Sequence, residues 1–307
     1  MVDEAIDDVD CSSGDIHEFA DGMVVNIDKP RGPSSHQVAS WVADIFGLDK
    51  ASHTGTLDPV VTGCLPFFLG RGSGAVRLFQ GDVKEYVFVL ELHGDVTETR
   101  LEEVMSEFEG VIYQKPPVKS GVKRRIRERE VEELELLEYD RGEGRALVEC
   151  RCGAGTYIRK LCHDVGLVIG TGAQMRELRR TASGVFDVED SVYLQDLEDA
   201  VAAESKDGSS VKEGDFGLDA VLTPMYDVLE RKGVPFVTVN ESARESLSNG
   251  SPLYSPGVAH TEGTENTIGE VGSGVTAAAV SWQREVLAIG KYRPDEEPVF
   301  LPQNVFY

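Results

Sequence analysis

Asp58 is the residue of this sequence that is best placed to do chemistry. It lies in the run His53-Thr54-Gly55-Thr56-Leu57-Asp58-Pro59-Val60-Val61-Thr62-Gly63. Pro59 disfavours a helical conformation for the residue before it, and the glycines allow unusual backbone angles on either side. The run therefore predicts a shaped loop that presents one carboxylate, as a nucleophile is presented. A tight turn closed by an Asx-type hydrogen bond is the alternative interpretation of the same residues.

Four further strings supply an aromatic ring and a guanidinium that could act together with this carboxylate. They are Val25-Asn26-Ile27-Asp28-Lys29-Pro30 with Gly32 and Ser34-Ser35, then Lys84-Glu85-Tyr86-Val87, Gly155-Thr156-Tyr157-Ile158-Arg159, and Glu177-Leu178-Arg179-Arg180-Thr181 with Gly184. Taken alone, Tyr86 in an apolar strand is typical of a core residue, and Arg159 on a helix is typical of a surface ion pair. Only as a set do these strings favour a functional site.

Hydrophobic periodicity places the strings on an alternation of strands and helices. It predicts strands at about 23–27, 65–69, 86–92, 131–139 and 146–152, and helices at about 101–108 and 157–168. Ser34 or Ser35 is expected to cap a helix with an apolar face of Val38, Trp41, Val42 and Ile45. Grouped strands with interspersed helices predict an α+β fold, in which a central mixed or antiparallel sheet is flanked by helices.

Changes in composition divide the chain into segments. Residues 1–22 are acidic and predict a disordered tail, and residues 23–222 carry all five strings in one large domain. Residues 204–217 are polar and predict a loop or linker inside it. Residues 233–293 form a shorter, strand-rich unit, expected to be a small β-barrel that binds a partner. Residues 294–307 are expected to be a C-terminal tail.

The charge of the chain is strongly acidic, at −24. Residues 115–180 are the exception, because they hold 15 of the 30 Lys and Arg residues but only 11 of the 54 Asp and Glu residues. We call the densest part of this region the basic island, namely Lys119, Lys123, Arg124, Arg125, Arg127 and Arg129. A basic cluster kept in so acidic a chain predicts an anionic partner. The acidity elsewhere is typical of adaptation to high salt.

The remaining composition excludes several classes of protein. No apolar run approaches the roughly 18–20 residues of a membrane span, and the acidic N-terminus does not resemble a signal peptide. Five cysteines are scattered, and the spacing of Cys150 and Cys152 fits alternate strand positions without a second pair to complete a zinc site. We expect no metal, no membrane contact, reduced thiols and a cytoplasmic location.

Together, the five strings resemble the TruB-type pseudouridine synthases in type, order and spacing, over residues of about 22 to 200. Residues of about 233 to 293 resemble a PUA domain, an RNA-binding module fused to many members. Residues 114–127 run through the basic island without the thumb insertion of bacterial members. In this the chain looks like the archaeal homologue of dyskerin, the catalytic protein of H/ACA guide-RNA particles, and its acidity suggests a halophilic archaeon.

The resemblance implies roles for matching residues. Asp58 would be the catalytic acid acting on C1′ of the target nucleoside, Tyr86 would stack on the uracil, and Arg159 would orient Asp58. Tyr157 and Leu178 would line the pocket, and His53 would help to hold the flipped nucleotide. The chemistry suits these residue types, since a guanidinium lowers a nearby carboxylate pKa by roughly one to three units and a stacked ring contributes about 1–3 kcal/mol per base. The isomerisation needs no cofactor.

Three functions remain open from the sequence. The first is modification of rRNA, and of some tRNA, as the catalytic subunit of an H/ACA particle, with guide RNA, target RNA and small core proteins as partners. The second is a stand-alone enzyme that modifies the T-loop uridine of tRNA. The third is a non-catalytic RNA-binding scaffold, which has no use for Asp58, Tyr86 and Arg159 together. Lys119, Lys123, Arg124, Arg125 and Arg127 are the expected RNA-binding residues in each case.

Overall fold

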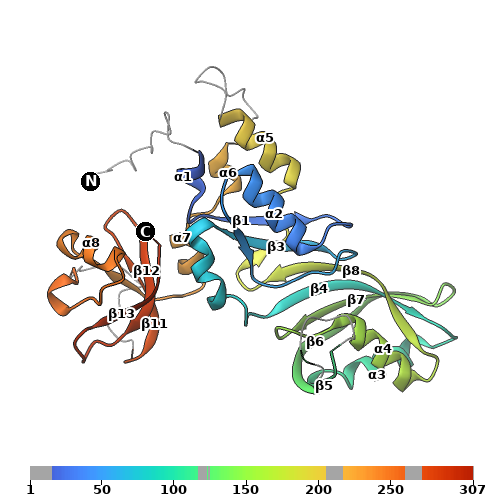
Figure 1. Ribbon diagram of the computed structural model, residues 1–307. Helices are drawn as coiled ribbons and strands as arrows, with labels where there is room; N and C mark the ends of the chain where they lie inside the picture. Colours follow the sequence, from blue (N-terminus) through green and yellow to red (C-terminus); the bar gives the residue numbers. More distant parts are fainter. Residues whose placement is uncertain (1–15, 117–122, 124, 205–216, 260–271, 307) are drawn as a thin grey trace, which may run out of the picture.

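The computed structural model describes residues 16–116, 123, 125–204, 217–259 and 272–306. Within these residues the chain forms one nine-stranded sheet and one four-stranded sheet, with helices packed around them (Figure 1). Lys119 and Arg124 of the basic island lie outside the described residues, as do residues 1–15 and most of the predicted loop at 204–217.

The large sheet is mixed, as predicted. Its order is β1-β3-β8-β4-β7-β6-β5, with β2 beside β3 and β9 beside β8. Every neighbouring pair is antiparallel except β3 and β8. The strands are β1 (Val24–Lys29), β2 (Ala51–His53), β3 (Thr62–Leu69), β4 (Lys84–Leu92), β5 (Gly110–Gln114), β6 (Arg127–Asp140), β7 (Arg145–Cys152), β8 (Ala173–Ser183) and β9 (Phe186–Asp187).

Helices cover the two ends of this sheet separately. Helices α3 (Glu98–Ser106) and α4 (Ile158–Ile169) pack on β4, β7 and β6, where Phe88, Leu90, Leu101, Val148 and Leu161 form one core. Helices α2 (Ser35–Ile45), α5 (Leu194–Glu204) and α6 (Leu218–Val221) pack on β1 and β3 around a second core (Figure 1). The central strands β8 and β4 lie between these two packed ends.

Local sequence signals explain where the helices begin. Ser34 caps α2 through a capping box with Gln37, which confirms one of the two predicted caps. Val38 and Val42 are buried as predicted, but Trp41 is 45% exposed, because the buried stripe of α2 is narrower than its apolar sequence. Thr156 does not cap α4, since its hydroxyl donates to the Gly153 carbonyl.

The C-terminal strands form an open sheet rather than the barrel that was expected. Strands β10 (Phe236–Thr238), β11 (Val275–Val280), β12 (Val286–Tyr292) and β13 (Phe300–Val305) pair in that order. No ladder among the described residues joins the edge strands β10 and β13 to each other. The segment at 251–259 makes one isolated bridge near each edge, Val239–Val258 and Leu253–Phe300. The connecting segment contains Pro252 and Pro256, which cannot donate to a sheet ladder.

The tails predicted at both ends are partly ordered. Helix α1 (Ile16–Ala20) falls within the predicted acidic tail and buries Ala20. Strand β13 lies within the predicted C-terminal tail, and Phe300 is fully buried. Pro302 lies within this strand and has no backbone N–H to donate, which is tolerated because β13 is an edge strand. Within the described residues, no helix is both long and apolar enough to cross a membrane.

A third core joins the C-terminal sheet to the large sheet. Val24 and Phe68 of the large sheet, Phe79 after the 3-10 helix η1 (Gly70–Leu78), and Met225 of α7 (Met225–Arg231) belong to the same buried cluster as Ile289 of β12. Helix α8 (Glu241–Ser248) and the 3-10 helix η2 (Ser255–Gly257) complete the C-terminal unit. This unit therefore shares a core with the rest of the chain.

Candidate active site

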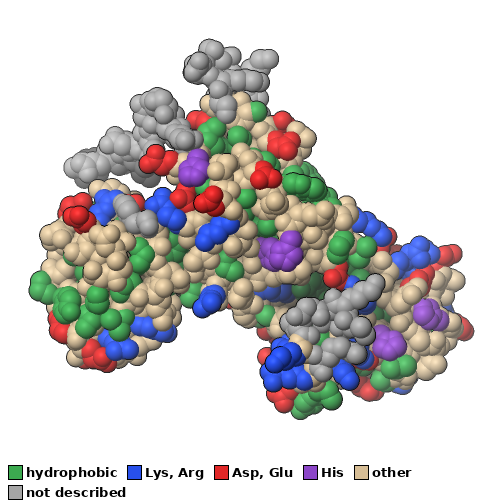
Figure 2. Space-filling model, in the orientation of Figure 1, with side chains coloured by type: hydrophobic (Ala, Val, Ile, Leu, Met, Phe, Trp, Pro, Cys, Tyr) green, Lys and Arg blue, Asp and Glu red, His purple; other side chains and the backbone are tan. Residues whose placement is uncertain are grey.

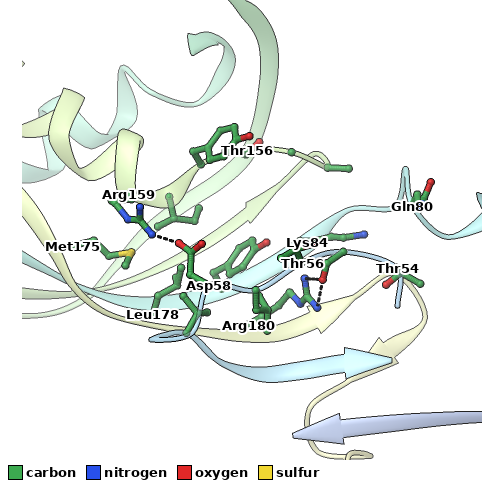
Figure 3. Close-up of a pocket in the computed structure, with 18 of the residues that line it drawn as sticks. Thr54, Thr56, Asp58, Gln80, Lys84, Thr156, Arg159, Met175, Leu178 and Arg180 are labelled. Carbon is green, nitrogen blue, oxygen red and sulfur yellow. Dashed lines mark hydrogen bonds and ion pairs between the residues drawn. The ribbon is translucent and has the colours of Figure 1, made fainter. Parts of the chain in front are cut away.

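A pocket of about 570 Å³ opens where the loop before β3, strands β4 and β8, and the start of α4 meet. Asp58, Tyr86, Tyr157, Arg159 and Leu178 all line it. Figure 3 shows Asp58 and Arg159 pointing toward each other from opposite walls. The structure thus brings together five of the six residues that the sequence predicted for catalysis and substrate binding.

Ser35 fixes the loop that carries Asp58 from behind. Its side chain is fully buried at the start of α2. The hydroxyl accepts a hydrogen bond from the Leu57 amide at 2.8 Å and donates to the Leu57 carbonyl at 3.0 Å. Both backbone groups of the residue before Asp58 are therefore satisfied by one side chain.

Lys29 fixes the other side of the same loop. Its side chain is fully buried at the end of β1, and its ammonium donates to the carbonyls of Val61 at 2.8 Å, Pro30 at 2.9 Å and Pro59 at 3.4 Å. Burial lowers the pKa of Lys29 to about 8. A buried cation bonded only to backbone carbonyls serves to hold the backbone around Asp58 in one shape.

Arg180 crosses beneath the loop from β8. Its side chain is 1% exposed, and it donates to the Cys64 carbonyl at 2.7 Å and, through both terminal nitrogens, to the Gly55 carbonyl at 3.3 Å. Gly63 makes the parallel pairing of β3 and β8 possible here. Its φ is +102°, and a Cβ at this position would lie 2.1 Å from the Arg180 carbonyl oxygen.

Arg159 reaches Asp58 from the first turn of α4. Its guanidinium donates to the Asp58 carboxylate. The two side chains are 47% and 53% exposed, so the ion pair contributes little to the stability of the fold. Its effect is local, because it places a permanent positive charge against one carboxylate oxygen and leaves the carboxylate facing the pocket.

Gln114, at the end of β5, fixes the start of α4. Its side chain is 1% exposed. The amide oxygen accepts from the Tyr157 backbone N–H at 2.9 Å, and the amide nitrogen donates to the Tyr157 carbonyl at 3.3 Å. Tyr157 is the N-cap of α4 and makes no side-chain capping bond, so Gln114 fixes the backbone of the N-cap residue itself, two residues before Arg159.

The pocket wall beside the Asp58 carboxylate and the Arg159 guanidinium is largely apolar. Tyr86, Leu178, Met175 and Ile158 line it, and all but Ile158 keep part of their surface exposed. Burial raises the pKa of the Tyr86 hydroxyl, and interaction with the Arg180 guanidinium opposes the rise. Tyr86 therefore stays protonated at neutral pH and presents a neutral aromatic ring.

His53 is not among the residues that line the pocket. It lies in β2, its ring packs against Phe67 at 5.9 Å between centroids, and its Nδ1 is buried without a hydrogen-bond partner. Burial, then the nearby His36 and Arg180, lower the pKa of His53 to about 4. His36, 5.6 Å from His53 between ring centroids, lines the pocket instead. His53 therefore does not line the pocket, and its contact with a flipped nucleotide stays a prediction.

The described part of the basic island divides into exposed and structural members. Lys123 and Arg125 are exposed, whereas Arg127 and Arg129 are half-buried. Arg129 donates to the Gly155 carbonyl at 2.7 Å and so supports the turn before α4. Figure 2 shows Lys and Arg side chains gathered over this β5–β6 end of the large sheet.

The C-terminal unit offers less positive charge to an anionic partner. Arg244 and Arg293 pair with glutamates, and Arg284 stacks on Tyr226.

Sequence reasoning did not identify several residues that shape the pocket: it named Ser35 only as an alternative helix cap, and gave Lys29, Arg180 and Gln114 no role in the pocket. Lys29, Ser35 and Arg180 stand inside the quoted strings, but nothing in the strings separates holding a loop from acting in it. Gln114 gives no signal, because its partner lies 43 residues away. Within the described ranges, no group of three or more His, Cys, Asp or Glu residues could hold a metal ion.

Comparison with known proteins shows the family of this chain. The family described as "TruB family pseudouridylate synthase (N terminal domain)" matches residues 43–158, and that described as "tRNA pseudouridylate synthase B C-terminal domain" matches residues 159–230. A "Probable tRNA pseudouridine synthase B" of Haloarcula marismortui is 46% identical over 84% of this chain and 78% of its own. The protein of that name from Methanocaldococcus jannaschii is 44% identical over 87% and 75%.

Solved structures resemble the whole chain, including the C-terminal sheet. The chain matches the "Crystal Structure of a Cbf5-Nop10-Gar1 Complex" with a TM-score of 0.77 and 37% identity, over 95% of this chain and 87% of that one. It matches "Structure of H/ACA RNP bound to a substrate RNA containing 2'-deoxyuridine" with a TM-score of 0.75 and 34% identity, over 99% and 93%. The four-stranded C-terminal sheet is consistent with a PUA domain. The chain belongs to the TruB family of pseudouridine synthases, which are isomerases.

Proposed function

We propose that this pseudouridine synthase acts on RNA as the catalytic subunit of an H/ACA guide-RNA particle. The observation that carries the proposal is the similarity over 99% of the chain to a protein of an H/ACA RNP solved with substrate RNA. The similarity includes the C-terminal unit. Guide RNA, target rRNA or tRNA and small core proteins are the partners we propose, in a cytoplasmic setting.

We propose that Asp58 acts at C1′ of the target uridine. The reaction breaks the C1′–N1 bond and forms a C1′–C5 bond to the same ring, so that C5 loses a proton and N1 gains one. An ionised carboxylate can attack or stabilise the sugar as its positive charge develops. Arg159 holds that carboxylate, and the face of Tyr86 with Leu178 gives the detached base an apolar surface on which to turn.

The uridine must leave its helix or loop before it can enter this pocket, which costs a few kcal/mol. Lys123 and Arg125 are exposed just before β6 and can bind flanking phosphates to offset that cost. We propose that they and the other members of the basic island bind RNA by its backbone, while base pairing with a guide selects the uridine.

The competing proposal is a stand-alone tRNA enzyme, which the names of the curated relatives favour. A modification assay distinguishes the two. Release of tritium from C5-labelled uridine would be measured on an rRNA fragment and on tRNA, each with and without a matching guide RNA and core proteins. Guide-dependent release from rRNA supports the first proposal. Guide-independent release confined to the T-loop of tRNA overturns it, and no release from either RNA would favour a scaffold.

We further propose that the chain is adapted to high salt, from its net charge of −24. Salt screens repulsion between surface carboxylates, with a Debye length of about 3 Å at 1 M and about 10 Å at 0.1 M. We expect the melting temperature to rise between 0.1 M and 2 M KCl. A melting temperature that stays constant over this range would contradict the adaptation.

A further inference from the structure

Two buried cations lie at one end of the pocket without an ion pair. Lys84 is 5% exposed and Arg180 is 1% exposed, and both line the pocket. Within the described part of the chain, no carboxylate contacts either of them. The carboxylate of the nearby Asp82 is bonded instead by Lys232, at 2.6 Å. Two like charges are therefore buried close together, and among the described residues neither forms an ion pair, although the Asp82 carboxylate acts on Lys84 at longer range.

Their hydrogen bonds go to the backbone and leave donors unused. The Lys84 ammonium donates to the Asp82 carbonyl at 2.8 Å and the Phe79 carbonyl at 3.5 Å, which uses two of three donors. Arg180 bonds the carbonyls of Cys64 and Gly55, and interacts with the Tyr86 hydroxyl. These bonds explain why polar side chains stand here, but not why both are charged, since neutral donors could serve the same carbonyls.

Burying an unpaired charge is unfavourable, and a second like charge nearby makes it more so. Burial, and then repulsion from Arg180, lower the pKa of Lys84 to about 8, while the charge of Asp82 opposes the fall. The ammonium stays mostly protonated at neutral pH. Arg180 stays charged at any such pH. This end of the pocket consequently has a positive potential that an anionic ligand would relieve.

The surrounding groups suit an anion and differ from those around Asp58. Thr54, Thr56 and Gln80 lie at the same end of the pocket as Lys84 and Arg180, away from Arg159, Met175 and Leu178 (Figure 3). Thr and Gln side chains can donate hydrogen bonds to phosphate oxygens. The carboxylate of Asp58 is already paired with Arg159, so it does not neutralise the two buried cations. Uracil is neutral and requires no such charge.

We propose that Lys84 and Arg180 form an anion subsite, which binds the phosphodiester group adjacent to the target uridine. The proposal rests on the proposed function, in which the substrate is RNA. A phosphate fixed at this end would set the distance between the sugar and Asp58 at the other end. The subsite would thereby position C1′, whatever the sequence of the RNA around it.

The test is a coupling experiment on the RNA that the wild-type protein modifies. The phosphate on the 5′ side or the 3′ side of the target uridine is replaced singly by an uncharged methylphosphonate. Wild-type kcat/KM should fall by about 10- to 100-fold for one of the two positions, the range of one charge-assisted hydrogen bond. In Lys84→Met that position should lose its effect, because the variant has already lost the contact.

Equal losses at that position in the wild-type protein and in Lys84→Met would overturn the subsite, as would no loss at either position. If wild-type protein makes no pseudouridine in the unsubstituted RNA, the proposed function fails instead, so the two failures are distinguishable.

Gln80→Glu provides a second variant that does not disturb the core, because Gln80 is exposed. It should raise KM about tenfold by repelling the phosphate, while Gln195→Glu on α5, outside the pocket, should not.

Discussion

The two walls of the Asp58 pocket are held in different ways. On one wall, the loop that carries Asp58 is fixed from behind by two fully buried polar side chains, Lys29 and Ser35. On the other wall, Arg159 stands on the first turn of a helix whose N-cap has no side-chain capping bond and depends on Gln114. The Asp58–Arg159 pair itself is half-exposed.

This difference separates what must be rigid from what can adjust. A carboxylate that acts on one carbon atom must be placed to within a fraction of an ångström, which requires a loop with no freedom. A cation that only balances charge tolerates more movement. Variants that loosen the wall of Asp58 should therefore lower kcat more than variants that loosen the wall of Arg159.

The largest effect is expected at Asp58 itself. Asp58→Asn keeps the shape of the side chain but removes its charge, and we expect pseudouridine formation to fall by at least about 1,000-fold. The fold should be retained because the side chain is half-exposed. Tritium release and circular dichroism test both points. Asp164→Asn on α4, outside the pocket, is the control and should remain active. Activity of Asp58→Asn within about tenfold of wild type would remove Asp58 from the mechanism.

Lys29→Met tests the rigid wall. The variant keeps the length of the side chain but leaves three carbonyls without their donor, so we expect about 2–3 kcal/mol less stability and a kcat about 10- to 100-fold lower. Thermal unfolding and single-turnover kinetics give the two values. Lys50→Met changes an exposed lysine and should alter neither. A normal kcat in Lys29→Met would show that the loop needs no such support.

Gln114 tests the adjustable wall with a matched pair of variants. Gln114→Ala removes both bonds to Tyr157 and should lower kcat about tenfold, while costing roughly 1–2 kcal/mol of stability. Gln114→Glu keeps the acceptor for the Tyr157 N–H but loses the donor, so its effect should be smaller. If Gln114→Ala reduced kcat more than Lys29→Met, the contrast between the two walls would be wrong.

The smallest effect concerns the pH dependence of stability next to the rigid wall. The pKa of His53 is lowered to about 4 in the folded protein, from an ordinary value of 6.5. As pH falls from about 6.5 to about 4, the unfolded state binds a proton that the folded state does not, so stability should fall over that window and be unaffected above it. Lowering a pKa from 6.5 to about 4 corresponds to at most roughly 3 kcal/mol, and because His53 is only partly buried we expect a loss of roughly 1–2 kcal/mol, measured by urea unfolding at several pH values. The slope should shrink in His53→Asn, and an unchanged slope would show that His53 is not the group responsible.

The sequence predicted much of this molecule because its strongest signals are local. The Ser34 cap, the apolar strands and the order of the motif strings all follow from neighbouring residues. The predictions failed where distant residues decide the outcome. Residues 294–307 were expected to be a tail, but pairing with β12 makes β13 a strand. Trp41 was expected on the apolar face of α2, but the second core does not extend far enough to cover it.

The same reason explains which parts of the site were missed. Asp58, Tyr86 and Arg159 were found because their strings resemble a known family. Gln114 could not be found, since its function depends on a contact across 43 residues. His53 was expected to help hold the nucleotide because of the same resemblance, but it pairs with Phe67 across β2 and β3 and its ring packs against that residue.

The shared third core fixes the position of the C-terminal unit relative to Asp58. Because Ile289 and Val280 are buried in the same cluster as Val24 and Phe68, this unit cannot swing without exposing apolar surface. Any RNA held by the C-terminal sheet is consequently held at a constant span from Asp58. A guide would still select the uridine by base pairing, but only a uridine at that span would reach Asp58, so an insertion of a few nucleotides within the span should reduce modification of the selected base.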